Sequence, residues 1–444
     1  MSRNHLRAAL AASTAAVVLA GCGAGGRDAS SGGDSESGDT TGVTDTTISV
    51  GTHQPLTGVA APGYSEINTG MKAYFDYVNE AGGIHGRKLE LTVKDDGYNP
   101  TNTSKVVDEL VLKDNVFAIL GGLGTPTHTA VVDFLNKEEV PDLFVSSGAQ
   151  LWGNDPEARP WTFGWQPDYE IEGKIMGQWI KENKPNAKVG LFLQGDELGG
   201  DGEKGLRQYV DDQIVERVEY ASGNTDIGPQ ISKLKASGAD LVVGFNTPSY
   251  TALSQLASMK LGYDPTWMYT NVGSDPKLAG ELLSTFSKGK VKGGGALDGA
   301  MTTEYIPGVG EESPWVDLWE KVWKEQGGKG ELTNYRVYGM SQAYLFASAL
   351  QAAGKDLTRE RIVDVIEQDA KNWPGPNLAP FRYSADSHLG ISGMRMAKIK
   401  GLKTTALTDV LVTDLGDAEI TKDETDVAAV VPPKDGLPDV EVLK

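Results

Sequence analysis

Residues 116–150 constrain the fold more than any other part of the sequence. Two short apolar runs, residues 116–120 and 143–145, are each followed by a loop of small and polar residues, 121–125 and 146–150. A helical pattern lies between the runs, which we interpret as parallel strands joined through a helix. Ligands of open α/β sheets bind at the edge formed by the carboxyl ends of such strands. The stretch therefore predicts a parallel sheet with a ligand site at these two loops.

The same alternation of strand and helix patterns runs through most of the chain and is interrupted three times. Residues 153–167, rich in Pro, Gly and Trp, end a first series, and a second series covers residues 169–286. The Gly-rich residues 291–300 and the sequence NWPGPNLA at 372–379 are two further interruptions. Long irregular segments inside a compact fold are often functional or cross between lobes. The pattern predicts an α/β fold with two series of parallel strands and helices, and three irregular segments as candidate crossings between lobes.

The interruptions also give expected lobe boundaries. The first lobe should comprise residues 47–166 plus 299–378, and the second should comprise 167–298 plus 379–420. Residues 421–444 are acidic and contain proline, and the pattern does not place this C-terminal tail.

The N-terminus has the features of a targeting segment. Residues 1–21 combine Arg3 and Arg7 with an apolar run too short to span a bilayer, and the sequence LAGC at 19–22 matches a bacterial lipobox. Cys22 is the chain's one cysteine, which excludes an intrachain disulfide framework and favours lipidation over an ordinary secretory signal with an incidental Cys. Residues 22–46, mostly Gly, Ser, Asp, Thr and Ala, should form a disordered tether. We expect a protein anchored by lipid to the outer, extracytoplasmic face of the cell membrane.

Charge and motif content argue against several function classes. The formal net charge of −20 makes nucleic acid a poor partner. The sequence contains no Walker A motif and no His spacing typical of a metal site, so we expect neither a cofactor nor a metal. Ser147 lacks the G-x-S-x-G surroundings of a hydrolase nucleophile. The protein is therefore expected not to be an enzyme, with a secreted hydrolase kept as the weakest alternative.

Several short segments, in this order and spacing, carry a family resemblance. They are PLTG at 55–58, NEAGGIHG at 79–86, DD at 95–96 with NP at 99–100, GGLGT at 121–125, VP at 140–141 before SSG at 146–148, and D226 … LK 234–235 … GAD 238–240. Over roughly residues 47–415 the chain resembles the type I periplasmic-binding-fold receptors of ABC importers, in the branched-chain amino acid and amide branch. The resemblance implies two Rossmann-like lobes that are joined by three crossover segments, matching the three interruptions, and that close on a small solute. It also implies a monomer that delivers this solute to a membrane permease. A ligand-sensing ectodomain with the same fold remains an alternative.

The loops of the opening stretch supply the first half of the candidate site. Thr125 is predicted as a helix N-cap with Pro126 at the first helical position, so its hydroxyl and the neighbouring N–H groups could bind an anion or simply cap the helix. The resemblance implies that this position donates to a ligand carboxylate and adds its neighbour Gly124. It also places Ser146 and Gly148 at the ligand's polar head, although Gly148 offers only its backbone. The alternative to ligand contact is that Ser146, Ser147 and Gly148 simply form a tight polar turn.

The second half of the site departs from the amino-acid-binding pattern. The acidic residue that pairs with a ligand ammonium in the family maps near Val272, and a common aromatic maps near Leu198. Since a buried ammonium needs a carboxylate partner, this departure disfavours a free α-amino acid. Asn246 and Asn271 could instead hydrogen-bond an amide or a hydroxyl. Aromatic side chains that could either wall the pocket or belong to ordinary core packing are Tyr64, Trp165 and Tyr335.

Overall fold

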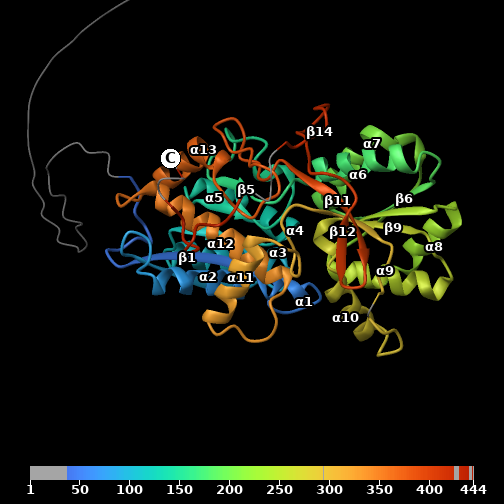
Figure 1. Cartoon of the computed structure of the whole chain (residues 1–444), viewed down its shortest axis with the longest axis horizontal. Helices are drawn as coiled ribbons and strands as arrows, with labels where there is room; N and C mark the ends of the chain where they lie inside the picture. The colour runs from blue at the N-terminus through green and yellow to red at the C-terminus, as the bar shows by residue number, and fades with distance from the viewer. Residues whose placement is uncertain (1–37, 294, 425–429, 440–442, 444) are drawn as a thin grey trace, which may run out of the picture. The chain divides into compact units, whose positions relative to one another are not determined.

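The computed structural model describes residues 38–293, 295–424, 430–439 and 443 (Figure 1). The expected signal peptide and the lipidation site Cys22 lie outside these residues. Within the described part of the chain, no helix is long and apolar enough to cross a membrane. The folded body has the two α/β lobes predicted from the alternation of strand and helix patterns.

The first lobe is built on a five-stranded parallel sheet in the order β2-β1-β3-β4-β5. The strands are β1 Thr47–Gln54, β2 Lys88–Asp95, β3 Ala118–Leu120, β4 Asp142–Val145 and β5 Thr162–Gly164. Every residue of the three strands β3, β4 and β5 is buried, as expected for a parallel sheet covered on both faces. The lobe's helices are α1 Ala61–Tyr64, α2 Ile67–Glu80, α3 Pro100–Leu112, α4 Thr125–Thr129, α5 Val132–Lys137, α11 Pro314–Glu325, α12 Asn334–Ala353 and α13 Arg359–Asp369.

The second lobe is built on a larger, mixed sheet in the order β14-β13-β11-β10-β9-β8-β6-β7, with β12 paired to β11. Its strands are β6 Val189–Gln194, β7 Ile214–Tyr220, β8 Leu241–Phe245, β9 Thr266–Tyr269, β10 Met301–Glu304, β11 Gly393–Lys400, β12 Lys403–Ala406, β13 Leu411–Val412 and β14 Thr421–Lys422. Strands β6 to β10 are parallel, whereas β11 to β14 pair antiparallel. Its helices are α6 Tyr169–Asn183, α7 Glu197–Val210, α8 Gly228–Ser237, α9 Pro248–Leu261 and α10 Pro276–Phe286, with short 3-10 turns at Asp211–Gln213 and Asn271–Gly273. Two further 3-10 turns, Gln150–Trp152 and Ala370–Asn372, belong to the first lobe. In Figure 1 the red β11 and β12 lie in the same lobe as the green and yellow strands that precede them by more than a hundred residues.

Two of the expected lobe boundaries are wrong. Strand β10 pairs with β9 and β11, so the chain stays in the second lobe through Glu304 and does not leave it at residue 299. After α13 the chain remains on the first lobe as far as Ile391, because His388 stacks on Phe163 of β5 and the Tyr383 hydroxyl donates to the Gly164 carbonyl. The third crossing therefore follows residue 391 and not residues 372–379.

The three crossings lie side by side. The backbone N–H of Ile391, on the third crossing, donates to the carbonyl of Trp165 on the first at 2.9 Å. The Trp165 ring also meets the Tyr305 ring of the second crossing edge-on, with 5.9 Å between ring centroids. The three crossover segments thus connect the lobes at one place, which is the geometry of a hinge.

Both ends of the described chain pack against the first lobe. Residues 38–46, expected as part of the disordered tether, are ordered: Gly42 accepts a hydrogen bond from Ser49, and Asp39 forms an ion pair with the buried Arg359 at 3.0 Å. At the other end, the Tyr74 hydroxyl donates to the Gly436 carbonyl at 2.9 Å. The C-terminal tail, which the sequence pattern did not place, therefore begins with β14 in the second sheet and returns to the first lobe.

Candidate functional site

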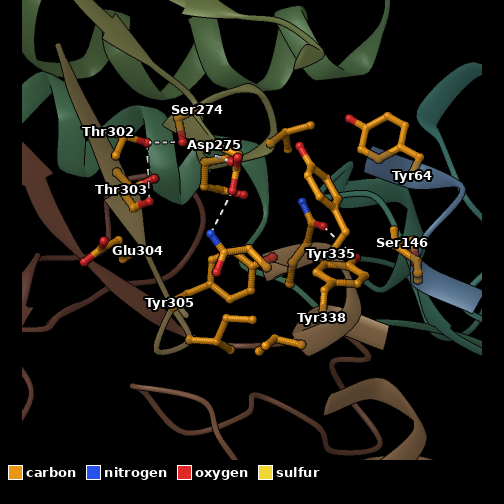
Figure 2. A pocket seen from close by; sticks show the side chains of 18 of the residues that line it. Tyr64, Ser146, Ser274, Asp275, Thr302, Thr303, Glu304, Tyr305, Tyr335 and Tyr338 are labelled. Carbon is orange, nitrogen blue, oxygen red and sulfur yellow. Dashed lines mark hydrogen bonds between the residues drawn. The ribbon is translucent and has the colours of Figure 1, made fainter. Parts of the chain in front are cut away.

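A cavity of about 230 Å³ lies between the two lobes, at the carboxyl edges of both sheets (Figure 2). Its wall contains the predicted site residues Tyr64, Gly124, Thr125, Ser146, Leu198, Asn271, Val272 and Tyr335. The predicted residues Ser147, Gly148 and Asn246 and the aromatic candidate Trp165 are not part of the wall. Wall residues that are not among the predicted site residues include Tyr98, Gln166, Tyr169, Asp275, Thr302, Thr303, Tyr305 and Tyr338.

Hydroxyl groups of the first lobe form one end of the cavity. Thr125 is the first residue of α4, with Gly124 in the capping position, so the predicted N-cap is displaced by one residue. The Thr125 hydroxyl lies 2.8 Å from the Ser147 hydroxyl. Ser146 is fixed more firmly, since its Oγ accepts from the Gln342 amide at 3.0 Å while donating to the Gly121 carbonyl at 3.0 Å. The arrangement presents Thr125 and Ser146 at the ends of adjacent strands.

Ser147 and Gly148 support the site from behind. Among the described residues, the hydrogen-bond partners of the Ser147 hydroxyl are the hydroxyl groups of Thr125 and Tyr169, the latter at 3.5 Å, and the Ala149 N–H, none of which is a general base. Gly148 accepts a hydrogen bond from the Tyr169 N–H at 2.8 Å, and an added Cβ there would meet the Pro167 carbonyl at 2.8 Å. Gly148 thus allows the first crossing to pass close to the loop. Burial raises the pKa of Tyr169 to about 12, so its hydroxyl remains protonated.

The Gly121–Thr125 loop requires glycine at position 124. Gly124 has a φ of 103°, and a Cβ there would lie 2.4 Å from the Tyr98 ring and 2.5 Å from the Thr127 hydroxyl. Tyr98 itself has a φ of 59°, directly after the Asp95–Gly97 turn. The absent side chain at Gly124 therefore lets the Tyr98 ring reach the cavity.

The second lobe contributes a polar floor built on a buried carboxylate. Glu172 accepts from the Thr270 hydroxyl at 2.7 Å, from the Asn271 backbone N–H at 2.8 Å and from the Thr303 hydroxyl. Burial raises the pKa of Glu172, and these hydrogen bonds oppose that rise. Asn246 lies away from the cavity, with its amide donating to Thr251. The floor holds the Asn271–Gly273 turn, and with it Val272, against the cavity.

Asp275 is the carboxylate of the second lobe closest in sequence to Val272 that lines the cavity. Its Oδ1 accepts from the Leu278 N–H at 2.7 Å and caps α10, and its Oδ2 accepts from the Asn334 amide of the first lobe at 2.7 Å. A second contact between lobes joins the Ser249 hydroxyl to the Val59 carbonyl at 2.7 Å. The lobes therefore touch across the cleft as well as at the hinge.

A chain of four buried side chains lies directly behind the Gly121–Thr125 loop. Asp96 Oδ2 lies 2.8 Å from His53 Nδ1, His53 Nε2 lies 2.9 Å from His128 Nδ1, and His128 Nε2 lies 2.8 Å from Asp142 Oδ2. All four residues are fully buried. Three hydrogen bonds need three protons, whereas two neutral imidazoles carry two. We call Asp96, His53, His128 and Asp142 the Asp-His-His-Asp chain.

The Asp-His-His-Asp chain also fixes the position of the Gly121–Thr125 loop. A Cβ on Gly122 would lie 2.5 Å from His128 Nδ1 and 2.6 Å from His53 Nε2, so the loop rests on the two rings. His128 lies in α4 together with Thr125. The described residues contain no group of three or more His, Cys, Asp or Glu side chains arranged to hold a metal ion.

These features can be compared with known proteins. Residues 47–405 match the family model described as periplasmic binding protein. The chain belongs to this family. Its members are binding proteins, and the type I periplasmic binding fold expected from the sequence is confirmed by solved structures.

Similar members of the family come from several bacteria. A Leu/Ile/Val-binding protein homolog 1 from Brucella abortus is 24% identical over 320 residues, which are 70% of this chain and 80% of the relative. A branched-chain amino acid ABC transporter protein from Thermus thermophilus, solved with bound valine, has a TM-score of 0.71 at 19% identity and covers 84% of this chain and 98% of its own. A fatty acid ABC transporter substrate-binding protein from Thermomonospora curvata also has a TM-score of 0.71, at 22% identity, and covers 89% of this chain and 97% of its own. At these identities the solved structures show the fold alone.

Proposed function

We propose that this periplasmic binding protein captures a small solute that bears a carboxylate or an amide on an apolar body, and delivers it to the permease of an ABC importer. The observation that carries the proposal is the cavity itself. It lies between two lobes joined by three adjacent crossings, and its wall takes residues from both lobes and from the second crossing. A solute in it would stabilise the contacts that join the lobes.

The chemistry of the wall supports this class of solute. The end of the cavity near Thr125 and Ser146 offers hydroxyl groups, which suit a carboxylate or an amide. Aromatic rings such as Tyr64, Tyr335 and Tyr338 line the remainder and suit an apolar body. The solutes named for the related proteins, valine and fatty acid, both combine a carboxylate with a hydrocarbon part.

We also propose that Cys22 carries the lipid that anchors the protein to the outer face of the cell membrane, and that the protein acts as a monomer. The lipobox sequence at residues 19–22 and the polar segment after it support the anchor. Mass spectrometry of the protein extracted from membranes should find a diacylglyceryl group on Cys22. A Cys22→Ala variant recovered in the same membrane fraction would contradict the anchor.

A metabolite thermal-shift screen tests the proposed function. The screen should contain branched-chain amino acids, primary amides, and aliphatic and aromatic acids at concentrations well above their Kd. A solute present at about 100 times its Kd adds about 2.7 kcal/mol to the free energy of unfolding, which is readily visible as a rise in Tm. The solute should be recovered unchanged after incubation. A screen without a stabilising compound, or chemical turnover of the bound compound, would contradict the proposal.

A further inference from the structure

We infer that the solute is amphipathic: a single carboxylate or carboxamide head without an ammonium group, on an unbranched hydrocarbon chain longer than a branched-chain amino acid side chain. The inference rests on the proposed function and narrows its substrate class. It follows from four features of the cavity, which are its head-group end, the state of its carboxylates, its size, and its mouth.

The head-group end offers an unpartnered donor. Gln166 is only 5% exposed and lies on the first crossing, and its side-chain oxygen accepts from the Tyr338 hydroxyl at 3.0 Å. Nε2 of the same side chain is buried and has no hydrogen-bond partner among the described residues, although Gln166 belongs to the cavity wall. A buried amide donor without a partner costs free energy. An acceptor oxygen on the solute, as in a carboxylate or a carboxamide, would satisfy it beside Thr125 and Ser146.

The carboxylates in the wall are already engaged. Both oxygens of Asp275 accept hydrogen bonds, from Leu278 and Asn334. Arg395 pairs with Glu304 at 2.8 Å and with the third wall carboxylate, Glu311, at 2.7 Å. In Figure 2 Glu304 also lies on the opposite side of the cavity from Ser146. An ammonium group next to the head would therefore lose its water without gaining a free counter-ion.

The cavity is larger than a branched-chain amino acid requires. One water occupies about 10–15 Å³, so a cavity of about 230 Å³ admits roughly 15–23 groups of that size, against roughly nine non-hydrogen atoms in leucine. Side chains that surround the space beyond the head-group end include Tyr64, Val272, Tyr305 and Tyr335. Their ring faces suit methylene groups, whereas a compact amino acid would leave much of this space unfilled.

The mouth of the cavity is apolar and exposed. Val309, on the second crossing, is 36% exposed, and Leu402, at the tip of the β11–β12 hairpin, is 58% exposed, although both line the cavity. The segment around Val309 is held in place, because its N–H donates to the Asn334 side chain at 2.8 Å and Gly308 donates to Glu311 at 2.8 Å. Large exposed apolar side chains at the rim of a cavity are typical of a ligand surface. The free end of a hydrocarbon chain bound by its head at Thr125 would cover Val309 and Leu402.

The test measures Kd for a series of ligands by calorimetry on delipidated protein, using butanoate, hexanoate, octanoate, dodecanoate, octanamide and leucine. Each methylene taken out of water should tighten binding about fourfold. The gain should continue through the aliphatic series and level off once the chain passes Leu402. Octanoate or octanamide should bind at least tenfold more tightly than leucine, a difference of about 1.4 kcal/mol.

Two variants separate the mouth from the head-group end. Leu402→Asp should weaken dodecanoate about tenfold and leave butanoate within about twofold, because only the long chain reaches the mouth. The matched control is Leu112→Asp: Leu112 is also 58% exposed but lies at the end of α3 and not in the cavity wall. This control should change neither ligand's Kd.

Other outcomes would overturn the inference in distinguishable ways. If leucine binds more tightly than every acid, or if Kd does not change with chain length, the inference fails while the proposed function stands. If Leu402→Asp leaves the whole series unchanged, the mouth serves another surface, such as the permease, and the inference also fails. If no acid, amide or amino acid binds, the proposed function itself fails.

Discussion

The Asp-His-His-Asp chain gives a quantitative prediction for the stability of the first lobe. Replacing His128 with leucine removes two hydrogen bonds and leaves Asp142 with the Thr162 hydroxyl, at 3.0 Å, as its one remaining donor. Removing one partner of a buried charged pair costs about 3–5 kcal/mol, because the other charge stays buried without compensation. A lobe of this size loses about 2–4 °C in Tm for each kcal/mol, so His128→Leu should lower the Tm by about 6–20 °C.

Differential scanning calorimetry at pH 7 measures this change, and two further variants sharpen it. In His128→Leu/Asp142→Asn the buried charge is gone as well, so the double variant should be less destabilised than the sum of the single variants by about 2 kcal/mol. His85→Leu is the matched control, since His85 is exposed and makes one hydrogen bond, to the Gln351 carbonyl. Its effect should stay within about 0.5 kcal/mol. A fall of less than 2 °C for His128→Leu, or strict additivity in the double variant, would refute the argument that buried Asp142 depends on its hydrogen bond to His128.

The Asp-His-His-Asp chain also predicts the direction in which the stability of the protein changes with pH. Burial, with the neighbouring His128 ring, lowers the pKa of His53, so this ring takes up a proton less readily in the folded chain than in the unfolded chain. The unfolded chain does take up that proton below its ordinary pKa of about 6.5. Stability is therefore lost as the pH falls below about 6.5, with a slope of up to about 1.4 kcal/mol per pH unit for each such histidine. His388, whose pKa burial also lowers, acts in the same range, so His53→Leu should reduce the slope and not abolish it.

Three further predictions concern the cavity and its loops. Burial raises the pKa of Asp196 to about 6, above its unfolded value. Ionising this carboxyl is therefore harder in the folded chain than in the unfolded chain, and the free energy of unfolding falls as the pH rises to 6. Asp196→Asn should therefore raise the Tm at pH 8 by a few degrees and lose this advantage below about pH 4; an equal gain at both pH values in thermal unfolding would contradict the argument. Thr125→Val should weaken the solute found in the screen about tenfold in calorimetry with little change in Tm, and an unchanged Kd would remove Thr125 from the site. Gly124→Ala should lower the free energy of unfolding, measured by chemical denaturation, by about 1–3 kcal/mol, because position 124 has a φ of 103° and the new Cβ would meet the Tyr98 ring. The control is Gly200→Ala in α7, where nothing lies within 4 Å of the new Cβ, and it should leave the stability unchanged or raise it.

The sequence predicts the fold well where local patterns are strong. The apolar run at residues 116–120 contains β3, the run at 143–145 lies within β4, and the loops after both runs do reach the cavity. The boundary expected at residue 299 is misplaced because β10 has four residues, too few to show a period of two. Strand β10 is recognised as a strand only through its partners β9 and β11, the second of which lies about ninety residues away in sequence.

The candidate site divides in the same way. Thr125 and Ser146 follow strands of the first lobe, and their positions at the sheet edge follow from topology. Tyr98 could be flagged by its place after the Asp-Asp-Gly turn, but only the folded chain shows that its ring passes over Gly124. The pairing of His53 with His128 joins residues 75 positions apart, so a search for metal-ligand spacing does not detect it.

The side-by-side crossings have a consequence for how the chain reaches its folded state. Neither lobe is a continuous stretch of chain: α12, which packs on α2, is made only after most of the second lobe, and β11, which pairs with β10, is made later still. A nascent chain that ends before residue 300 would expose the apolar face of α2 and an unpaired β9 edge at the same time. Such non-local closure slows folding and prolongs the aggregation-prone stage. The two lobes should therefore become stable together, only once the last third of the chain is present.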